Sequence, residues 1–443
     1  MAQPELLAQH CAEAGLAEKA VSYWLKAGLQ AVARSAMTEA VAQLQKGLDM
    51  LGRLPDGPCR RLQELDLQMA LRPALAATKG YSAPDVGETL ARARALAEQL
   101  DRPDCLVPLL LGQYKFHLVR SEYRLALSLA RQMESIGETR NDVAASLLSH
   151  LLQGGTLFFL GDITTARSHL EQSHGLGDPA HRAVYSAEED PHVVSLALLA
   201  MTLMYLGYID SGRARMSEAV FEARRLDQAH TLAFVLNWTC EAAWALSLPQ
   251  EAYQSSEEIL SLSSQHGFSF WLAEGSLYRG WSMAALGNAR EGLAMLTKGL
   301  SARRAAGAEL STPQALMLFD EAYAQLGQPV EGLNCLAEAG EIIERTEERY
   351  NEVELHRLRG DLLNTTGDQA AAERNYHQAL EVAKRQRAKL WELRAATSLT
   401  RLWRDQGKRC EARDLLAPVY GWFTEGFDTP ILKDAKVLLD QLT

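Results

Sequence analysis

Apolar and polar residues alternate along this chain in the pattern of helical hairpins. The stretch LLNTTGDQAAAERNYHQAL, residues 362–380, has an apolar segment, a break at Gly367-Asp368, and then small and aromatic residues at helical spacing. Because the buried face of a helix repeats every three to four residues, this pattern predicts two helices joined by a tight turn. No alternation of period two persists anywhere in the sequence, so we expect a chain that is nearly all helix.

The break recurs at a fixed distance. Successive breaks lie 40 residues apart, except for one step of 46, whose six extra residues fall in the region 175–191. A fixed period between 20 and 50 residues is typical of repeat proteins. Five residues after each break comes another small residue, which would let a neighbouring helix approach closely. The breaks are at Ser121, Gly161, Gly207, Ser247, Gly287, Gly327, Gly367 and Gly407, and the second small residues are Ala126, Ala166, Gly212, Ala252, Gly292, Gly332, Ala372 and Ala412.

Three repeats carry a further glycine seven residues before the break, at Gly154, Gly280 and Gly360. This position falls inside the first predicted helix, where glycine costs about 1 kcal/mol relative to alanine. Tight contact with a second helix is the best explanation for it, and Gly360→Val should therefore destabilise the protein.

The series Gly360, Gly367, Ala372, Tyr376 and Ala379 resembles the tetratricopeptide repeat (TPR), although the period here is 40 residues and not about 34. The resemblance runs from about residue 121 to the end of the chain, and the repeats around Ser121 and Ser247 fit it less well. It implies an all-α fold, a right-handed superhelical solenoid of TPR-like helix hairpins with a period of about 40 residues.

Upstream of these repeats, glycine and proline residues interrupt the helical pattern and so mark the ends of further predicted helices. Two helices should break near Ser35, a loop should follow at residues 55–58, and a second break falls at residues 79–85. We expect three parts, namely N-terminal helices at residues 1–56, a helical hairpin at 57–102, and a TPR-like solenoid with C-terminal capping helices at 103–443.

The composition of the chain excludes several classes of function and location. Acidic residues (56) outnumber lysine and arginine (45), and a formal charge of -11 argues against a nucleic-acid partner. The six cysteines have no paired spacing, so we expect buried free thiols in a reducing compartment. No secretory signal is visible, which favours a cytoplasmic location. Residues 193–209 are nearly uncharged but fall short of the ~20 apolar residues that span a bilayer, so we expect a helix buried on all sides and no membrane partner.

A second resemblance is more specific. Residues 4–28, 270–287 and 402–442 resemble the C-terminal helical region of large bacterial proteins that join a class III adenylate or guanylate cyclase domain to a STAND-type signalling ATPase. This resemblance implies that residues 1–56 form the junction to an ATPase module. The enzymatic parts are not found in this sequence. No GxxxxGK[ST] loop is present, because Gly407-Lys408 lacks the upstream glycine and is followed by Arg409.

The sequence gives only weak signs of a metal site or of catalytic residues. His169, His174, His181 and His192 lie near the acidic residues 188–190, but their spacing matches no metal-ligand motif. No GxSxG sequence supports a serine hydrolase, and no acidic cluster supports a helical-repeat enzyme such as an α/α-toroid. We therefore expect no catalytic residues, no metal and no cofactor.

The first helix of each TPR hairpin lines the concave face of the solenoid, and its inward positions fall ten, six and three residues before the break. Side chains there could clamp a protein, a peptide or a small effector in the groove. Two functions follow, a non-catalytic interaction or sensor module, and alternatively the effector-sensing tail of a cyclase, an ATPase or a related transcription activator. A solvated face that binds nothing is the competing interpretation, and the oligomeric state stays open. The candidate groove residues are Asn237, Glu241, Trp244, Trp281, Glu321, Arg357, Asp361, Asn364, Thr397, Arg401 and Arg404.

Overall fold

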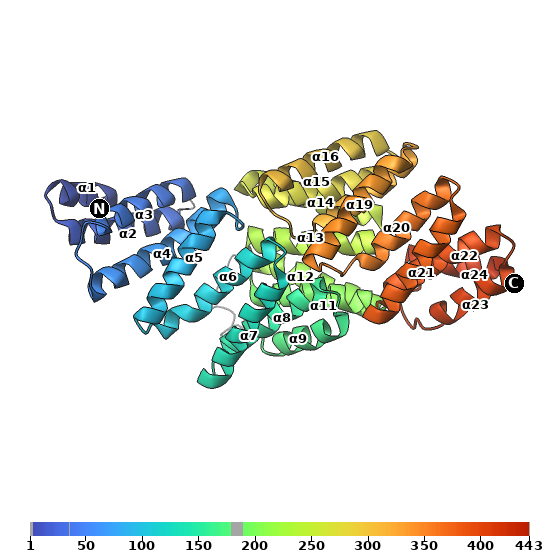
Figure 1. The fold of residues 1–443 in the computed structure, drawn as a ribbon, viewed down its shortest axis with the longest axis horizontal. Helices are drawn as coiled ribbons and strands as arrows, with labels where there is room; N and C mark the ends of the chain where they lie inside the picture. The colour runs from blue at the N-terminus through green and yellow to red at the C-terminus, as the bar shows by residue number, and fades with distance from the viewer. Residues whose placement is uncertain (1–2, 35, 179–188, 443) are drawn as a thin grey trace. The chain divides into compact units, whose positions relative to one another are not determined.

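The computed structural model describes residues 3–34, 36–178 and 189–442, and within these ranges the chain folds into α-helices joined by short turns, with no strand (Figure 1). The first helices are α1 (Pro4–Glu13), α2 (Ala17–Ala33), α3 (Met37–Leu51), α4 (Pro58–Lys79), α5 (Pro84–Gln99), the 3-10 helix η1 (Pro103–Cys105), α6 (Leu106–Val119), α7 (Tyr123–Arg140), α8 (Val143–Phe159) and α9 (Ile163–Gly175).

The later helices follow the same alternation. They are α11 (Pro191–Tyr205), α12 (Ile209–Leu226), α13 (Ala229–Ala245), α14 (Pro249–His266), α15 (Ser269–Ala285), α16 (Ala289–Ala305), α17 (Thr312–Met317), α18 (Phe319–Gln325), α19 (Pro329–Thr346), α20 (Glu352–Thr365), α21 (Gln369–Gln386), α22 (Lys389–Asp405), α23 (Arg409–Tyr420) and α24 (Pro430–Leu442). Consecutive helices pack as hairpins, for example α11 on α12, α15 on α16 and α20 on α21.

Every predicted break is a left-handed turn. The φ angle is positive at all eight positions, from 56° at Ser121 to 96° at Gly207. Glycine adopts this conformation without the steric cost that other residues have, which explains why a small residue recurs there. In the repeats at Gly161 and Gly367 an aspartate follows the break and caps the second helix, since Asp162 Oδ1 accepts the N–H of Thr165 at 3.2 Å and Asp368 Oδ1 that of Ala371 at 3.0 Å. These turns confirm the predicted repeat.

A second series of left-handed turns joins one hairpin to the next. The residues at these turns are chemically unlike one another, so the sequence did not reveal the series. They are Asp227, Gly267, Gly307, Glu347 and Arg387, at the same 40-residue spacing.

Close helix contact explains the glycines inside the first helices. A Cβ atom added to Gly360 would lie 2.4 Å from Tyr376 Cε1, and one added to Gly280 would lie 2.7 Å from the carbonyl oxygen of Gly292. At Gly154 the added atom would lie 2.6 Å from Leu170 Cγ. The packing that the sequence predicted at these glycines is confirmed.

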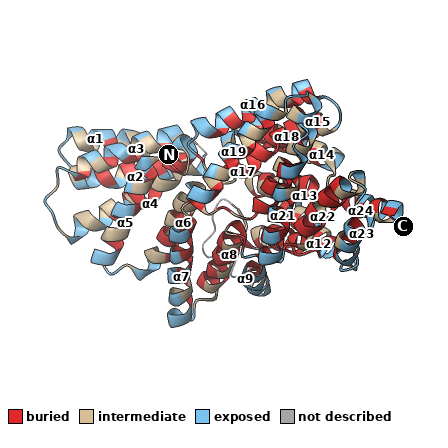
Figure 2. Cartoon of the chain, turned by 45° about the vertical axis from the view of Figure 1, so that its right-hand side comes forward, coloured by how far each residue is buried: buried red, intermediate tan, exposed pale blue. Residues whose placement is uncertain are grey.

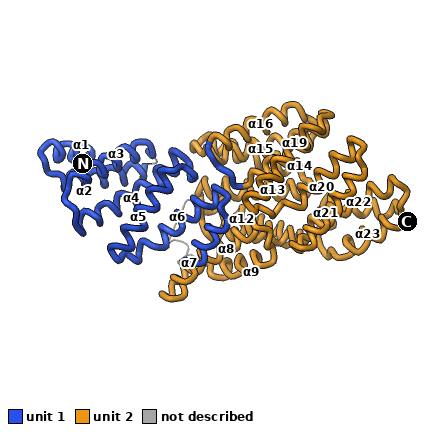
Figure 3. Tube along the Cα trace, viewed as in Figure 1, with its two compact units in different colours: residues 1–133, 306–310 blue, residues 134–305, 311–443 orange. Residues whose placement is uncertain are grey.

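The chain divides into two compact units (Figure 3). Unit 1 comprises residues 1–133 and 306–310, and its core is built from apolar residues of α3, α4 and α5. Unit 2 comprises residues 134–305 and 311–443. The part boundaries that we expected at residues 56 and 102 both fall within unit 1 and stay predictions.

Unit 1 includes a short segment that is distant in sequence. The backbone N–H groups of Glu309 and Leu310 donate to the carbonyl oxygen of Val119 at 3.0 and 3.1 Å. Ser82 Oγ donates to the carbonyl oxygen of Ala306 at 3.2 Å. These bonds hold residues 306–310 against the helices of unit 1.

Two expectations about apolar residues met different outcomes. Helix α11, which contains most of the uncharged stretch, is buried on nearly all sides, as predicted, and Figure 2 shows that buried residues concentrate where the helices of unit 2 pack on one another. None of the described helices combines the length and apolarity needed to cross a membrane.

The cysteines are free thiols, but only Cys240 is buried, while Cys59 and Cys410 are exposed. The expectation of uniformly buried cysteines was wrong, because these two lie on the outer faces of their helices.

Unit 2 closes on itself. The N–H groups of Arg349 and Tyr350 donate to the carbonyl oxygen of Phe159 at 2.8 and 3.2 Å, although α8 and α20 are separated by several repeats. The superhelix therefore turns tightly enough for its later repeats to contact its earlier ones.

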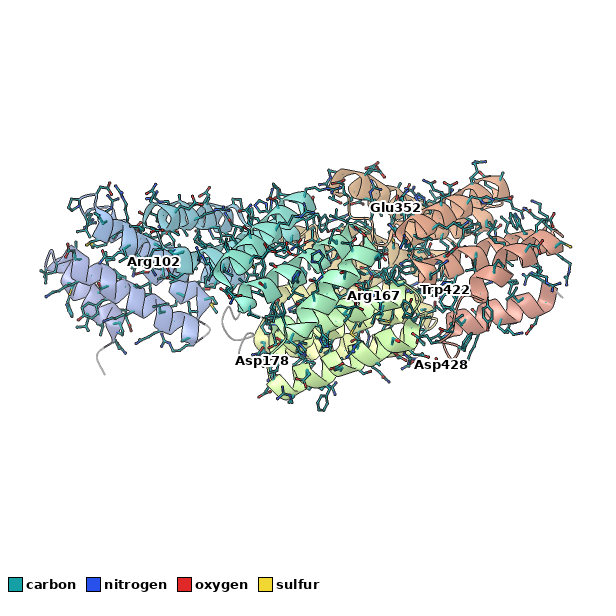
Figure 4. All side chains as sticks on the ribbon, turned by 90° about the horizontal axis from the view of Figure 1, so that it is seen from below. Arg102, Arg167, Asp178, Glu352, Trp422 and Asp428 are labelled. Atoms are coloured by element: carbon teal, nitrogen blue, oxygen red, sulfur yellow. The ribbon has the colours of Figure 1, made fainter. Side chains whose placement is uncertain are left out.

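The loop after α23 makes a second contact of this kind. Ser211 Oγ donates to Glu425 at 3.1 Å, 214 residues away in the sequence, and Arg213 pairs with Asp428 at 3.1 Å. Trp422 packs against Tyr208 with ring centroids 5.9 Å apart, and Figure 4 labels Trp422 and Asp428.

Candidate functional site

The centre of the concave face in unit 2 is filled by its own aromatic residues. Phe158 contacts Tyr205 and Tyr350, each with ring centroids 5.2 Å apart, and Trp238 at 5.9 Å. Phe159 contacts Tyr350 at 5.3 Å. Such pairs bury large apolar surface. The solenoid is therefore closed at this level, where we had expected an open groove.

Glu241 lies in this closed region and accepts three hydrogen bonds. Tyr205 Oη and Asn351 Nδ2 donate to Glu241 Oε1 at 3.2 and 3.0 Å, and Tyr278 Oη donates to Oε2. Burial raises the pKa of Glu241, while these hydrogen bonds act in the opposite direction. The expectation that Glu241 faces an open groove does not hold, because residue 351, from a later superhelical turn, covers it.

Asn237 lies one turn before Glu241 on α13. Its Oδ1 atom is buried and has no hydrogen-bond partner, and it does not line the pocket described next. Asn237 is half-buried, and its role in the groove stays a prediction.

The concave face stays open further along, where α13, α15, α18, α20, α22 and α24 surround a pocket of about 360 Å³. We call it the inner pocket. Most of the predicted groove residues meet there, on five of these helices. The predicted residues that line it are Trp244, Trp281, Glu321, Arg357, Asp361, Thr397 and Arg401.

Besides Asn237 and Glu241, two further predicted residues lie outside the inner pocket. Asn364 and Arg404 stand three residues before their breaks, one helical turn beyond Asp361 and Arg401. Arg404 donates instead to Asp405 at 2.9 Å and to Gln441 at 2.8 Å. The last turn of the first helix therefore reaches past the pocket in the final two repeats.

A buried carboxylate organises the floor of the inner pocket. Glu354, whose side chain is 0% exposed, accepts two hydrogen bonds from Arg357, at 2.7 and 2.6 Å, and one from Arg394 at 2.8 Å. Burial alone would oppose ionisation of Glu354. The charges of Arg357 and Arg394 outweigh it and lower the pKa of this carboxyl group to about 2.

The same arginines make most of their hydrogen bonds to other protein groups, and only the buried Nε atom of Arg394 has no acceptor. Arg357 also donates to Asp361 and, at 3.3 Å, to Ser398. Arg394 donates to the carbonyl oxygen of Ala245 and to Ser247 Oγ, each at 2.9 Å, so it ties α22 to the turn after α13. Both guanidinium groups therefore hold the pocket together and have little capacity left for a ligand.

Sequence reasoning missed Glu354 and Arg394. They lie 40 residues apart, at the same position of two adjacent repeats, thirteen residues before the break. Opposite charges at equivalent positions of neighbouring repeats were the available signal, because such positions lie side by side on adjacent helices.

Two carboxylates of the inner pocket, those of Asp320 and Glu321, accept no hydrogen bond from a basic side chain among the described residues. Asp320 is half-buried and its Oδ1 atom is buried without a hydrogen bond. Burial, and then the charge of Asp361, raise the pKa of Asp320 well above its ordinary value, although the charge of Arg357 acts in the opposite direction. Glu321 accepts a hydrogen bond at 2.8 Å from Gln325 of its own helix. Neither forms a salt bridge with any described residue.

Aromatic side chains and one cation complete the pocket. Trp244 and Trp281 are 4% and 6% exposed, and Trp244 contacts Trp391 with ring centroids 5.7 Å apart. Arg401 lies 3.5 Å from Asp434, and both of these side chains are well exposed. An exposed pair of this kind contributes little to stability, so Arg401 remains available to a ligand.

The histidines do not assemble into a metal centre within the described ranges, where no group of three or more potential ligands occurs. His169 Nδ1 lies 3.0 Å from His150 Nδ1, and the ring of His174 stacks on that of His192 at 5.1 Å. His181 and Glu188 lie outside the described residues.

Comparison with known proteins confirms the fold class. No protein-family model matches the sequence. The complex of a Rap protein with competence and sporulation factor is similar with a TM-score of 0.59 and 12% identity, covering 84% of this chain and 99% of that one. The Cut9–Hcn1 hetero-tetramer of the APC/C is similar with a TM-score of 0.57 and 12% identity, covering 99% and 75%. At this identity the likeness shows the fold alone, a TPR-like helical solenoid.

One sequence relative is an uncharacterized protein of Rhizobium meliloti (strain 1021). It is 26% identical over 407 residues, which are 89% of this chain. The match covers 39% of the relative, so this chain spans well under half of its length.

Proposed function

We propose that unit 2 is a non-catalytic interaction or sensor module that binds a peptide segment of a partner protein, or a small effector, in the inner pocket. The observation that carries this proposal is the convergence of seven predicted groove residues on one pocket, beside a centre that aromatic side chains fill. Sites for small ligands are concave and combine apolar walls with a few placed polar groups. Trp244, Trp281 and Arg401 supply both kinds of group.

The similar structures support this proposal by analogy. One is a Rap protein in complex with competence and sporulation factor, and another is the Cut9–Hcn1 assembly. Each is a helical-repeat protein bound to another molecule. We extend to this chain only a binding role, without a cofactor, a nucleic acid or catalysis, in the cytoplasm.

The test is partner capture with a double variant. Tagged full-length chain and its Trp281→Ala/Arg401→Glu variant would be incubated with lysate of the source organism, and captured proteins compared by quantitative mass spectrometry. We expect at least one partner to be lost from the variant. Glu341→Gln, an exposed change on α19 away from the pocket, is the control and should retain it. Identical partner sets for all three proteins would contradict the proposal.

A second candidate function rests on the length of the relative. Since the match covers 39% of that protein, the present chain could be the effector-sensing region of a longer signalling protein, as its resemblance to cyclase- and ATPase-linked helical regions implies. Ligand binding would then shift an equilibrium in another part of the polypeptide.

An immunoblot of source lysate with an antibody against residues 189–442 tests this candidate. A band much larger than 48.9 kDa would support it. A band near 48.9 kDa would leave the interaction module as a separate protein and would contradict the second candidate.

A further inference from the structure

We propose that the inner pocket recognises a cation, the guanidinium group of an arginine side chain in a peptide, which it holds between the carboxylates of Asp320 and Glu321 and the tryptophan walls. This inference rests on the proposed function and adds the chemistry of the ligand. It follows from which charged groups of the pocket are already satisfied.

The charge balance of the inner pocket favours a cation. Five carboxylates and three guanidinium groups line it. Two of the guanidinium groups, those of Arg357 and Arg394, are ion-paired with Glu354 or Asp361 and bound to protein oxygens, and only the buried Nε atom of Arg394 has no acceptor. The lining carboxylates without such a partner are those of residues 320 and 321. A cationic ligand would supply the missing charge, whereas an anionic ligand would meet mainly negative groups.

Asp320 has an unfilled hydrogen-bonding capacity. Its buried Oδ1 atom has no donor, and an unsatisfied buried acceptor is costly. A ligand N–H group would fill this position and form a charge-assisted hydrogen bond, which is about twice as strong as a neutral one. Nothing on the described protein surface of the pocket provides that donor, because the neighbouring Arg357 is directed to Glu354 and Asp361.

The tryptophans favour a planar cation. A guanidinium group stacks on aromatic faces and is weakly hydrated, so its transfer into a partly buried pocket costs less than that of an ammonium group. Trp244 and Trp281 are both buried yet both line the pocket. Their presence therefore favours arginine over lysine as the ligand side chain.

An anion would find a poor site. Arg401 is the one lining guanidinium group that is not held by buried protein groups, and it already lies near Asp434 at the exposed side. It is better placed to contact a main-chain carbonyl or a carboxylate flanking the bound arginine than to hold an anion alone.

The experiment compares four probes on the full-length chain by ligand-observed NMR titration. The probes are N-acetyl-arginine amide, its neutral isostere N-acetyl-citrulline amide, the anionic N-acetyl-glutamate amide, and putrescine as a free cation. We expect the arginine probe to bind about tenfold more tightly than the citrulline probe and the glutamate probe not to bind. Putrescine should bind more weakly than the arginine probe.

Variants locate the binding. Asp320→Asn and Glu321→Gln should each weaken binding of the arginine probe by about fivefold or more. Glu341→Gln removes the same charge from an exposed position outside the pocket and should have no effect. If Asp320→Asn fails to fold, as judged by far-UV circular dichroism, then the cation inference is tested by Glu321→Gln and by the comparison of the arginine and citrulline probes.

Each contrary outcome has a meaning. Equal binding of the arginine and citrulline probes, preference for the glutamate probe, no binding of any probe, or indifference to the pocket variants would overturn the inference. Binding of putrescine as tightly as the arginine probe would overturn its assignment to a peptide side chain. If the probes contradict the inference but the Trp281→Ala/Arg401→Glu variant loses its partner in the capture experiment, only the cation inference fails. If the probes contradict it and partner capture is also unaffected by this variant, the proposed function fails as well.

Discussion

Replacing Glu354 by glutamine should destabilise unit 2 more than almost any other single change of charge. Glu354 is fully buried between Arg357 and Arg394 and accepts hydrogen bonds from both. Glutamine has nearly the same shape, so little packing is lost, but two buried guanidinium groups lose their counter-charge. Removing one partner from a buried ion pair typically costs about 3 to 5 kcal/mol.

The pKa of Glu354 leads to a similar magnitude. It lies at about 2 in the folded chain, against an ordinary value of 4.5. Because one pKa unit corresponds to about 1.4 kcal/mol, the difference corresponds to about 3 kcal/mol. The folded-state pKa is depressed, so this contribution is fully present above pH 4.5 and is lost as the pH falls towards 2. Above pH 5 it should be constant.

The assay is urea unfolding followed by far-UV circular dichroism and tryptophan fluorescence, at pH 7 and at steps down to pH 3. Glu354→Gln should unfold at a lower urea concentration than the wild-type chain at pH 7, and the gap should narrow as the pH falls. Glu341→Gln, the exposed control, should match the wild type. A wild-type unfolding midpoint for Glu354→Gln at pH 7 would refute the reasoning, since the ion-pair network would then contribute no net stability.

Three further changes test the packing and the turns. Gly360→Val should lower the free energy of unfolding by about 1 to 3 kcal/mol through overpacking, whereas Gly175→Val, where an added Cβ meets nothing, should be nearly neutral in the same urea assay. Glu241→Leu should cost about 3 kcal/mol or more, because three buried donors lose their acceptor; a neutral result in thermal unfolding would contradict the network. Arg387→Gly should raise the melting temperature slightly, because residue 387 has a φ of 56°, and a lower melting temperature would argue against relieved strain.

The sequence was sufficient for the local structure. The breaks at residues such as Gly207 and Gly367, the close helix contacts of the glycines, and the burial of the stretch that forms α11 were all predicted, whereas the left-handed conformation of the breaks was not. Each of these depends on residues within one hairpin, where sterics and helical spacing act over a few positions. The turns between hairpins were not predicted, because residues as different as Asp227 and Arg387 adopt the same backbone conformation there.

The candidate site was only partly accessible from sequence. Arg357, Asp361 and Arg401, chosen at positions ten and six residues before the break, line the inner pocket, since helical periodicity decides which way a side chain points; their role in binding stays a prediction. The partner of a charged residue was not accessible. Arg357 was predicted as a binding group and proved to be paired with Glu354, whose role no motif indicated.

What the sequence by itself determined is therefore the repeat, its helices and the face on which the candidate residues lie. Only the tertiary structure decided which part of that face is open. Glu241 is covered by Asn351, which is 110 residues away, whereas Asp320 and Glu321 still line a pocket. The physical reason is that the superhelical turn is the sum of small rotations between successive hairpins. No single repeat contains that sum, so contacts between distant turns cannot be read from the repeat pattern.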